Sequence, residues 1–393
     1  MTDQTNTPEL RFPEFNTDWT TNQAKNLFTN VSDKKHDGDL LVLSATQDKG
    51  MVPRQALDLE IKYDKKNLSN YKRTLPNDFI ISLRSFQGGF ELNTIEGIVS
   101  PAYTVLRGEE GLAQPKFFKQ YFKSIRFIKK LDSMIYGIRD GKSISYKEFS
   151  TFSINYPSIL EQQKIGDFFS KLDRQIELEE EKLELLEQQK KGYMQKIFSQ
   201  ELRFKDENGK DYPAWEIKKL RDLYKYQQGQ QIPVENQYKI PTNNMKRFIR
   251  IVDITENPKK RYIKDRKESG LINRKDLIMI RYGASAGTIS MGYEGVIANN
   301  LFKFVKKQNV DNRYFYFLLK KSHFKIKSLS SQSAMPALNF NAMDTLKFSI
   351  PQYSEQQKIG DFFSELDKLV EKQVSKIELL KQRKQGLLQK MFI

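Results

Sequence analysis

The sequence predicts an α+β protein in which two mixed α/β globular domains are joined by two long antiparallel coiled-coil helices, with an internal repeat about a pseudo-two-fold axis. Three observations lead to this prediction. A 13-residue segment occurs twice, 194 residues apart; a heptad pattern of apolar residues follows each copy; and strand-like and helix-like segments precede each copy. The expected order is globular, helical, globular, helical.

The repeat is clearest in residues 161–173 (EQQKIGDFFSKLD) and 355–367 (EQQKIGDFFSELD), where twelve of thirteen positions match. The same offset continues without a gap to residues 198 and 392. The preceding regions match more loosely, for example at Trp19 and Trp215. Two copies of nearly 200 residues predict two globular domains related by a pseudo-two-fold axis, rather than the many short units of a solenoid.

The first globular domain is expected to cover residues 1–157. Apolar and β-branched residues predict buried strands from Asp78 to Leu83 and from Gly97 to Leu106. Residues Pro115 to Leu131 combine Phe, Tyr and Leu with interleaved lysines, which predicts a helix with one apolar and one basic face.

The segment 158–199 is expected to be the first long helix, because its apolar residues recur at alternating steps of four and three. A helix from Glu161 to Phe198 would be about 57 Å long and could not lie within one small domain.

The second globular domain, residues 200–350, repeats the pattern of the first, with strands expected at Asp276 to Ile280 and Val296 to Val305 and a helix at Val310 to Leu329. The segment 351–393 repeats the long helix. An internal antiparallel pair is expected because both helices belong to one chain, although pairing with a second copy of the chain would satisfy the same pattern. The predicted helix-pair seam consists of Ile165, Phe169, Leu172, Ile176, Leu183, Leu186, Ile197, Ile359, Phe363, Leu366, Val370, Ile377, Leu380 and Leu387.

The composition favours a polyanionic partner. The chain has 66 Lys and Arg against 49 Asp and Glu, a formal net charge of +17, which is more than solubility requires. Cysteine is absent and no segment approaches the about 18 apolar residues of a membrane span, so we expect a cytoplasmic protein without a disulfide framework or a membrane anchor. With only two histidines, no metal site is expected.

Catalytic motifs are scarce. The sequence contains neither a phosphate loop ending in Gly-Lys-Ser or Gly-Lys-Thr nor a dinucleotide-binding fingerprint. Residues 283–287 (GASAG) fit the nucleophile elbow of a serine hydrolase, with Asp311 and His323 following in triad order. The residues after Ser285 are strand-like, whereas an elbow needs a helix there, so a hairpin turn is the favoured interpretation and no catalytic residue is assigned.

Binding residues are therefore expected among cations that could contact phosphates and among amide and guanidinium groups in loops that could hydrogen-bond to base edges. Each of them could equally serve as a solvated surface residue or in turn chemistry. The candidates are Gln47, Arg54, Lys72, Arg73, Arg84 and Gln87 in the first domain, and Gln228, Gln230, Asn243, Asn244, Arg247, Arg250, Arg281, Ser285 and Gln332 in the second.

The doubled layout and the motif Glu-Gln-Gln-Lys-Ile-Gly, which follows a short Pro-containing stretch in each copy, resemble type I restriction–modification specificity subunits. The resemblance extends over essentially the whole chain. It is specific in residues 161–198 and 355–392 and only generic in the globular domains. No departure from the family pattern is seen in the two specific segments.

The resemblance implies a non-catalytic subunit with two target-recognition domains, each recognising one half of a bipartite, asymmetric sequence in double-stranded DNA. It also implies two modification (methyltransferase) subunits that use S-adenosylmethionine, and restriction (endonuclease and translocase) subunits that use ATP and Mg. No cofactor is then expected in this chain. Two other possibilities stay open on the sequence alone: a coiled-coil scaffold whose domains bind protein, and the serine hydrolase.

Overall fold

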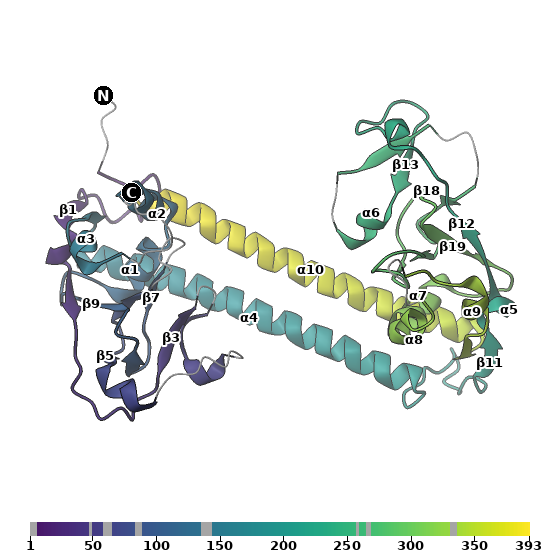
Figure 1. The fold of residues 1–393 in the computed structure, drawn as a ribbon, viewed down its shortest axis with the longest axis horizontal. Helices are drawn as coiled ribbons and strands as arrows, with labels where there is room; N and C mark the ends of the chain where they lie inside the picture. Colours follow the sequence, from purple (N-terminus) through teal and green to yellow (C-terminus); the bar gives the residue numbers. More distant parts are fainter. Residues whose placement is uncertain are drawn as a thin grey trace. The chain divides into compact units, whose positions relative to one another are not determined.

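The computed structural model describes residues 6–46, 49–57, 65–82, 89–134, 144–256, 259–264, 269–330 and 336–393. The chain divides into two compact units, traced in Figure 1: residues 1–181 with 375–393, and residues 182–374. Each unit therefore contains one globular domain and one half of each long helix.

The first unit is built on a four-stranded antiparallel sheet of order β2-β9-β6-β7. Its strands are β2 (Phe28–Val31), β9 (Thr104–Gly108), β6 (Phe79–Ile81) and β7 (Phe90–Leu92). Smaller pairs are β1 (Thr20–Gln23) with β10 (Ser153–Tyr156), β3 (Leu43–Thr46) with β4 (Gly50–Pro53), and β5 (Lys72–Thr74) with β8 (Gly97–Val99). Its short helices are η1 (Ala24–Asn26), η2 (Arg54–Ala56), η3 (Lys65–Asn70), α1 (Pro115–Tyr121), α2 (Ile125–Met134) and α3 (Tyr146–Ser150).

The second unit repeats this plan, with a four-stranded sheet β12-β19-β16-β17 and a second sheet β14-β13-β18-β15. The strands are β11 (Glu216–Lys219), β12 (Tyr224–Gln228), β13 (Lys246–Ile249), β14 (Arg261–Ile263), β15 (Leu271–Ile272), β16 (Ile278–Ile280), β17 (Ile289–Ser290), β18 (Gly295–Ile297), β19 (Leu301–Lys306) and β20 (Lys347–Ile350). The short helices are α5 (Leu220–Leu223), η5 (Val234–Asn236), α6 (Ile251–Thr255), α7 (Asn312–Lys321), α8 (His323–Lys327) and α9 (Phe340–Asp344).

The pairing around one strand shows that the two domains share a topology. In the second domain, β18 has β13 as its parallel neighbour and β15 as its antiparallel neighbour. In the first, β8 has a parallel bridge from Ile98 to Val42 and the antiparallel neighbour β5. The internal repeat therefore includes the globular domains, whose sequences have diverged most.

Several elements differ from the expectation by being split. The expected strand from Gly97 to Leu106 is two strands, β8 and β9, and the expected strand from Val296 to Val305 is the pair β18 and β19. Turn hydrogen bonds separate each pair, from the Tyr103 amide to the Ser100 carbonyl and from the Leu301 amide to the Ala298 carbonyl. The strands expected at residues 78–83 and 276–280 are shorter, at β6 and β16.

The two expected domain helices are also interrupted, each at a serine. Residues 115–131 form α1 and α2, and the Ser124 Oγ accepts a hydrogen bond from the Phe127 amide at the start of α2 (3.2 Å). Residues 310–329 form α7 and α8, with Ser322 ending the first and preceding the second. A serine favours such a break because it competes with the helical backbone for hydrogen bonds.

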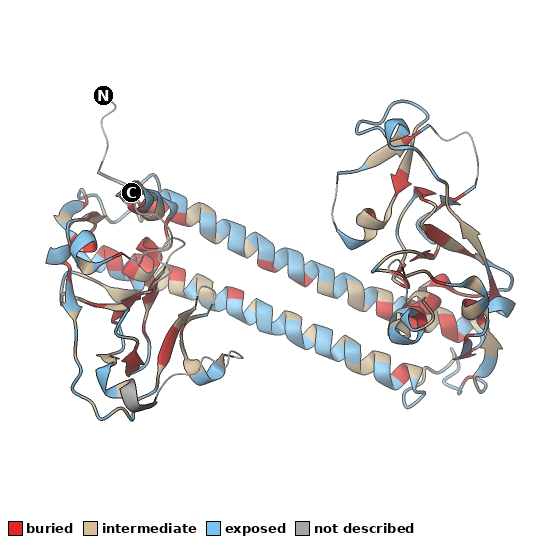
Figure 2. Ribbon diagram, in the orientation of Figure 1, coloured by how far each residue is buried: buried red, intermediate tan, exposed pale blue. Residues whose placement is uncertain are grey.

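Aromatic side chains dominate both cores. In the first unit, Trp19, Phe28, Phe117 and Phe118 are all buried, and the C-terminal Phe392 packs against Trp19 and Phe117. Figure 2 shows buried residues concentrated inside each globular domain, whereas the middle of each long helix is mostly exposed or half-buried. The domains therefore have apolar cores of their own, which the ends of the long helices complete.

The long helices are α4 (Ile159–Phe198) and α10 (Tyr353–Met391), and they pack against each other in antiparallel orientation. In the first unit, Lys384 pairs with Asp173 and Lys376 with Glu179, both at 2.6 Å. In the second unit, Lys190 contacts Asp367, the equivalent of the Asp173–Lys384 pair. The contacts lie within one chain, as the prediction of an internal pair requires.

The predicted seam residues lie along the covered side of each helix. Seven are buried and the other seven are half-buried. The buried ones are Ile165, Phe169, Ile176, Ile197, Ile359, Phe363 and Ile377, and the half-buried ones are Leu172, Leu183, Leu186, Leu366, Val370, Leu380 and Leu387.

The repeated Glu-Gln-Gln-Lys-Ile-Gly motif attaches each domain to its helix. In the first unit, Glu161 has no exposed side-chain surface and accepts two hydrogen bonds from Arg11, both 2.7 Å. Gln162 accepts from the Gln114 amide and donates to the Leu112 carbonyl, both 2.9 Å. Because these groups fix the start of α1 against α4, the motif is conserved between the copies for a structural reason.

The second copy makes the same contacts. Glu355 accepts from Arg203 at 3.2 and 2.7 Å, and Gln356 accepts from the Asp311 amide at 3.0 Å. The ion pairs with these glutamates raise the pKa of both Arg11 and Arg203. The two domains are therefore held on their helices by equivalent buried polar contacts.

Candidate nucleic-acid interface

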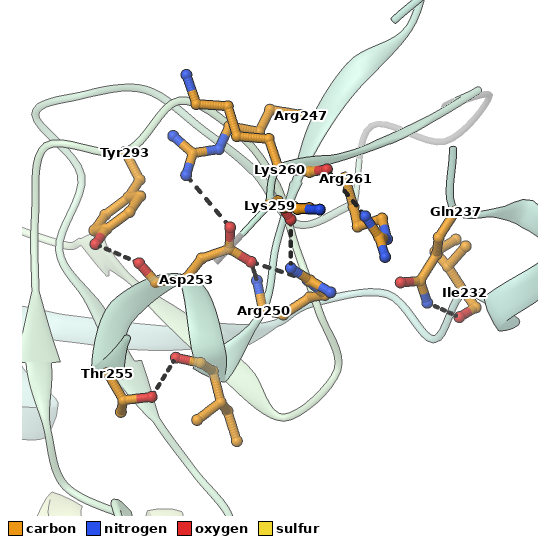
Figure 3. A network of polar contacts seen from close by, with 11 residues as sticks. Ile232, Gln237, Arg247, Arg250, Asp253, Thr255, Lys259, Lys260, Arg261 and Tyr293 are labelled. Atoms are coloured by element: carbon orange, nitrogen blue, oxygen red, sulfur yellow. Dashed lines mark hydrogen bonds and ion pairs between the residues drawn. The ribbon is translucent and has the colours of Figure 1, made fainter. Parts of the chain in front are cut away.

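A buried aspartate organises two of the predicted arginines in the second domain (Figure 3). Asp253, in α6, has no exposed side-chain surface, and its carboxylate accepts a hydrogen bond from the Arg250 Nε (2.9 Å) and one from the Arg247 Nη2 (3.4 Å). The Arg250 Nη2 also donates to the Lys259 carbonyl (3.2 Å). The side chain of Arg247 is 30% exposed and that of Arg250 is 22% exposed, so each is held in place while part of it still faces solvent.

Tyr293 supports this cluster from a neighbouring loop. Its hydroxyl donates to the Asp253 carbonyl (2.8 Å), and its ring lies 5.6 Å from the Arg247 guanidinium carbon. The backbone of Arg247 also packs closely against Gly295 of β18. A Cβ on Gly295 would lie 2.1 Å from the Arg247 carbonyl oxygen, so only glycine fits there. The position of Arg247 is therefore fixed by the sheet as well as by Asp253.

Strand β14 places more cations beside Arg247. Arg247 pairs with Tyr262 across β13 and β14, so these two side chains lie on the same face. Because successive side chains of a strand point to opposite faces, Lys260 and Lys264, each two residues from Tyr262, are assigned to the face of Arg247. Lys259, Lys260 and Lys264 are exposed. Among the residues that the structure describes, none of the three pairs with an acidic side chain, and such lysines are suited to neutralising phosphates.

A second group joins Gln228 and Arg281, two predicted base-recognition residues from β12 and the end of β16. The Arg281 Nη1 donates to the Gln228 Oε1 (2.5 Å), and the Gln228 Nε2 donates to the Asn299 carbonyl (2.5 Å). The guanidinium carbon lies 4.2 Å from the centroid of the Phe340 ring and 4.9 Å from that of Tyr282. Stacking and hydrogen bonding hold Arg281 in one orientation, which is a requirement for a residue that discriminates between bases.

The candidates in the first domain are more involved in internal contacts. Lys72 donates to the Tyr103 carbonyl (2.7 Å), and its burial lowers the pKa of its ammonium group. Arg73 pairs with Glu96 at 2.5 Å, and the Arg54 Nε donates to the Ser44 Oγ (3.0 Å). The structure thus gives all three a role within the fold.

The remaining predicted residues are scattered. Gln230 donates to the Ser269 carbonyl, Asn243 and Asn244 are exposed in the loop before β13, and Ser285 lies in the turn between β16 and β17. The predictions at Gln47, Arg84, Gln87 and Gln332 fall outside the described residues.

Sequence reasoning missed the residues that hold the arginines in place. Asp253, Tyr293 and Phe340 were not selected, because an acidic or aromatic residue is not itself a signal for binding a polyanion. For Asp253 a local signal existed: it lies three residues after Arg250 and accepts a hydrogen bond from the Arg250 amide (3.0 Å), as an acidic residue in the first turn of a helix often does. Tyr293 and Phe340 are distant in sequence and gave no such signal.

The hydrolase alternative has no geometric support. Ser285 is followed by strand β17, as the hairpin interpretation expects, and Asp311 caps α7 through the Arg313 and Tyr314 amides (2.9 and 3.0 Å). A nucleophile elbow places a helix directly after its serine. Within the described ranges, no cluster of three or more His, Cys, Asp or Glu side chains could hold a metal, and no helix is long and apolar enough to cross a membrane.

Comparison with known proteins identifies the repeated unit. The sequence model of the "Type I restriction modification DNA specificity domain" family matches residues 17–188 and again residues 213–382. The chain belongs to this family. The prediction of a type I specificity subunit, which carries recognition rather than catalysis, is thereby confirmed.

Curated relatives come from Methanocaldococcus jannaschii. The type I restriction enzyme MjaIX specificity subunit is 26% identical over 342 residues, which are 79% of this chain and 78% of that protein. The MjaVIII specificity subunit is 23% identical over 197 residues, 50% of this chain; the match spans 46% of the relative's length.

A solved structure shares the fold. The crystal structure of the S subunit of the type I restriction–modification system from M. genitalium matches 98% of this chain and 99% of that one, with a TM-score of 0.64 and 17% identity. This match, over the whole length of both chains, confirms the predicted fold class of two mixed α/β domains and two long helices.

Proposed function

We propose that this specificity subunit recognises a bipartite, asymmetric sequence in double-stranded DNA, with each globular domain binding one half-site. The observation that carries the proposal is the duplication of a DNA specificity domain in a single chain. The two copies are attached to their helices by equivalent contacts but differ in the residues available to contact DNA, so they are suited to two different half-sites.

The proposal assigns distinct roles to the residues of the second domain. Arg281, oriented by Gln228 and Phe340, would contact a base edge in the major groove, where arginine pairs well with guanine. Lys259, Lys260 and Lys264 would contact phosphates, which position a protein on the duplex without selecting a sequence.

The partners follow from the same proposal. Two modification subunits would methylate adenine with S-adenosylmethionine, and restriction subunits would use ATP and Mg to translocate and cut DNA, in the cytoplasm. This chain would hold none of those cofactors. It would select the site at which its partners act.

Replacing one domain tests the assignment of half-sites. Residues 20–155 are exchanged for the corresponding region of another family member, and adenine methylation is mapped by single-molecule sequencing in a host that carries the partner subunits. We expect one half of the methylated motif to change and the other half to stay the same. The equivalent exchange in the second domain, from Ile217 to Ser349, should change only the other half of the methylated motif.

The control is a strain in which the chain is deleted, where methylation of the motif should disappear. If either exchange altered both half-sites together, the assignment of one domain to each half would be wrong. If deletion left methylation of every motif intact, the chain would not direct methylation, and the scaffold that binds only protein would become the better explanation.

A further inference from the structure

The two domains carry very different charges, although they share a topology. Residues 200–350 contain 29 Lys and Arg against 15 Asp and Glu, a net charge of +14, whereas residues 1–157 contain 22 against 19, a net charge of +3. The two helical segments cancel each other. Most of the net charge of +17 of the chain therefore belongs to the second domain.

Within the second domain, the cations concentrate on one part of the fold. Within residues 246–264, we define the β13–β14 surface as Arg247, Arg250, Lys259, Lys260 and Lys264, whereas Lys246 and Arg261 belong to the other face of the two strands. The same stretch contains only two acidic residues, Asp253 and Glu256. Asp253 is fully buried beneath the arginines, so it orients two of the cations and presents no carboxylate to solvent (Figure 3).

Among its described residues, the first domain has no counterpart to this surface. A Cβ on Gly97 would lie 2.6 Å from the Leu41 carbonyl, just as a Cβ on Gly295 would lie against the Arg247 carbonyl. Leu41 thus occupies the place of Arg247. Across residues 40–57, which correspond to the β13–β14 region, the basic residues are Lys49 and Arg54 alone.

Several cations of the first domain already have acidic partners within the fold. Arg73 pairs with Glu96, Arg107 with Asp78 and Lys123 with Glu91. On the β13–β14 surface, by contrast, Lys259, Lys260 and Lys264 have no acidic partner within the described part of the chain. A cation that is not already neutralised releases more counterions when it meets a phosphate, so these three lysines are expected to contribute most to phosphate binding.

We propose that the two domains divide the work of binding DNA unequally: the β13–β14 surface of the second domain supplies most of the sequence-independent attachment to phosphates, and the first domain contributes mainly selection. This inference rests on the proposed function. Its consequence is an order of events in which the second domain holds the duplex first and the first domain samples sequence on DNA that is already bound.

The test compares two matched triple variants of the full-length chain. K259Q/K260Q/K264Q removes three cations of the β13–β14 surface, and K25Q/K34Q/K35Q removes three exposed lysines of the first domain. All six lysines are exposed, so neither triple disturbs a core. The dissociation constant for duplex DNA is measured from 50 to 300 mM salt, with a duplex carrying the methylated motif and with a scrambled duplex.

We expect K259Q/K260Q/K264Q to reduce the slope of log K against log salt by about 2 to 3, because each lost phosphate contact removes about 0.9. Affinity at 150 mM salt should fall by about tenfold or more, and by the same factor on both duplexes, because phosphates carry no sequence. K25Q/K34Q/K35Q should change the slope by less than about 1.

Equal slope changes in the two triples, or a larger change in the first-domain triple, would overturn the unequal division. That outcome differs from a failure of the proposed function, in which the unaltered chain with its methyltransferase partners would not distinguish the motif from the scrambled duplex. A fall in affinity that occurred only on the motif duplex would also overturn the inference, because the β13–β14 surface would then recognise bases.

Discussion

At the scale of single residues, Glu355 shows why the repeated motif tolerates so little change. Its carboxylate has no exposed surface, and Arg203, itself 24% exposed, supplies the balancing charge. The Trp215 Nε1 donates a third hydrogen bond (3.2 Å). A buried ion pair of this kind is costly to break from one side, because the remaining charge stays away from water without a partner.

Arg203→Ala is therefore expected to destabilise the second unit by about 3 kcal/mol, measured by chemical denaturation of the full chain. Lys368→Ala removes one partner of an exposed pair on α10, with Glu365, and should cost less than about 1 kcal/mol. The double variant Arg203→Met with Glu355→Gln should recover part of the loss, because it removes both charges. If Arg203→Ala lowered the free energy of unfolding no more than Lys368→Ala does, the Arg203–Glu355 pair would not be what holds the second domain on its helix.

Glu91 gives the first domain a pH dependence. Burial raises the pKa of this carboxyl, and Lys123, 3.0 Å away, only partly opposes the shift. The folded state therefore binds the proton more tightly than the unfolded chain. The contribution of Glu91 to the free energy of unfolding is least favourable at neutral pH and improves as the pH falls through the folded pKa.

Glu91→Gln removes this dependence. Thermal unfolding of both proteins between pH 7.5 and pH 4.5 should show the unaltered chain gaining stability relative to the variant as the pH falls. Because the comparison uses the difference between two proteins, acid effects at other sites cancel. If the difference in stability between the two proteins stayed constant with pH, or changed in the opposite direction, the pKa of Glu91 would not be raised in the folded state.

At the scale of elements, the glycines of the long helices separate into two kinds. A Cβ on Gly360 would approach the Asp311 Oδ1 to 2.8 Å and the Tyr314 amide to 2.9 Å, because α7 crosses α10 at this position. Gly386, also within α10, has no neighbouring atom within 4 Å of such a Cβ. Gly166 and Gly192 of α4 repeat the same two situations.

Gly360→Ala should destabilise the second unit by about 1–3 kcal/mol, because the packed backbone of α7 would have to move. Gly386→Ala should stabilise the chain by about 0.5–1 kcal/mol, since alanine is the better residue in the middle of a helix. Chemical denaturation measures both changes, and Gly166→Ala with Gly192→Ala provides an independent second pair. The decisive result is a loss of stability at the packed glycine of each pair and a gain at the open one. Equal changes in stability at both glycines would show that the close contact with the neighbouring helix is not the cause.

Elements that depend on local pattern were predictable from sequence, and those that depend on distant contacts were not. The heptad pattern located α4 and α10 nearly to their ends, because a long helix repeats its apolar spacing many times. The breaks at Ser124 and Ser322 were missed, since the apolar pattern continues across them. The cluster of Arg247 and Asp253 could be predicted only in part: its cations stand out in the sequence, but Tyr293 joins it through the fold.

At the scale of the whole molecule, the internal repeat defines where the chain can be lengthened. The boundary between the two compact units crosses α4 after Glu181 and α10 after Val374, which are equivalent positions within one residue of the 194-residue offset. Each unit keeps its own core and its own helix contacts. An insertion at both positions therefore leaves the contacts within each unit intact.

If the helix pair determines the number of unrecognised base pairs between the half-sites, lengthening both helices should lengthen that gap. Inserting one heptad after Glu181 and one after Val374, with apolar residues at the seam positions, adds about 10.5 Å of helix. We expect a methylated motif whose halves are unchanged and whose gap is longer by about three base pairs, as found by single-molecule sequencing of adenine methylation.

A control that replaces residues 175–181 with the same heptad, without adding length, should keep the original gap. Should the lengthened chain methylate the original motif, the helices would not determine the spacing, and the loops of the domains would have to do so.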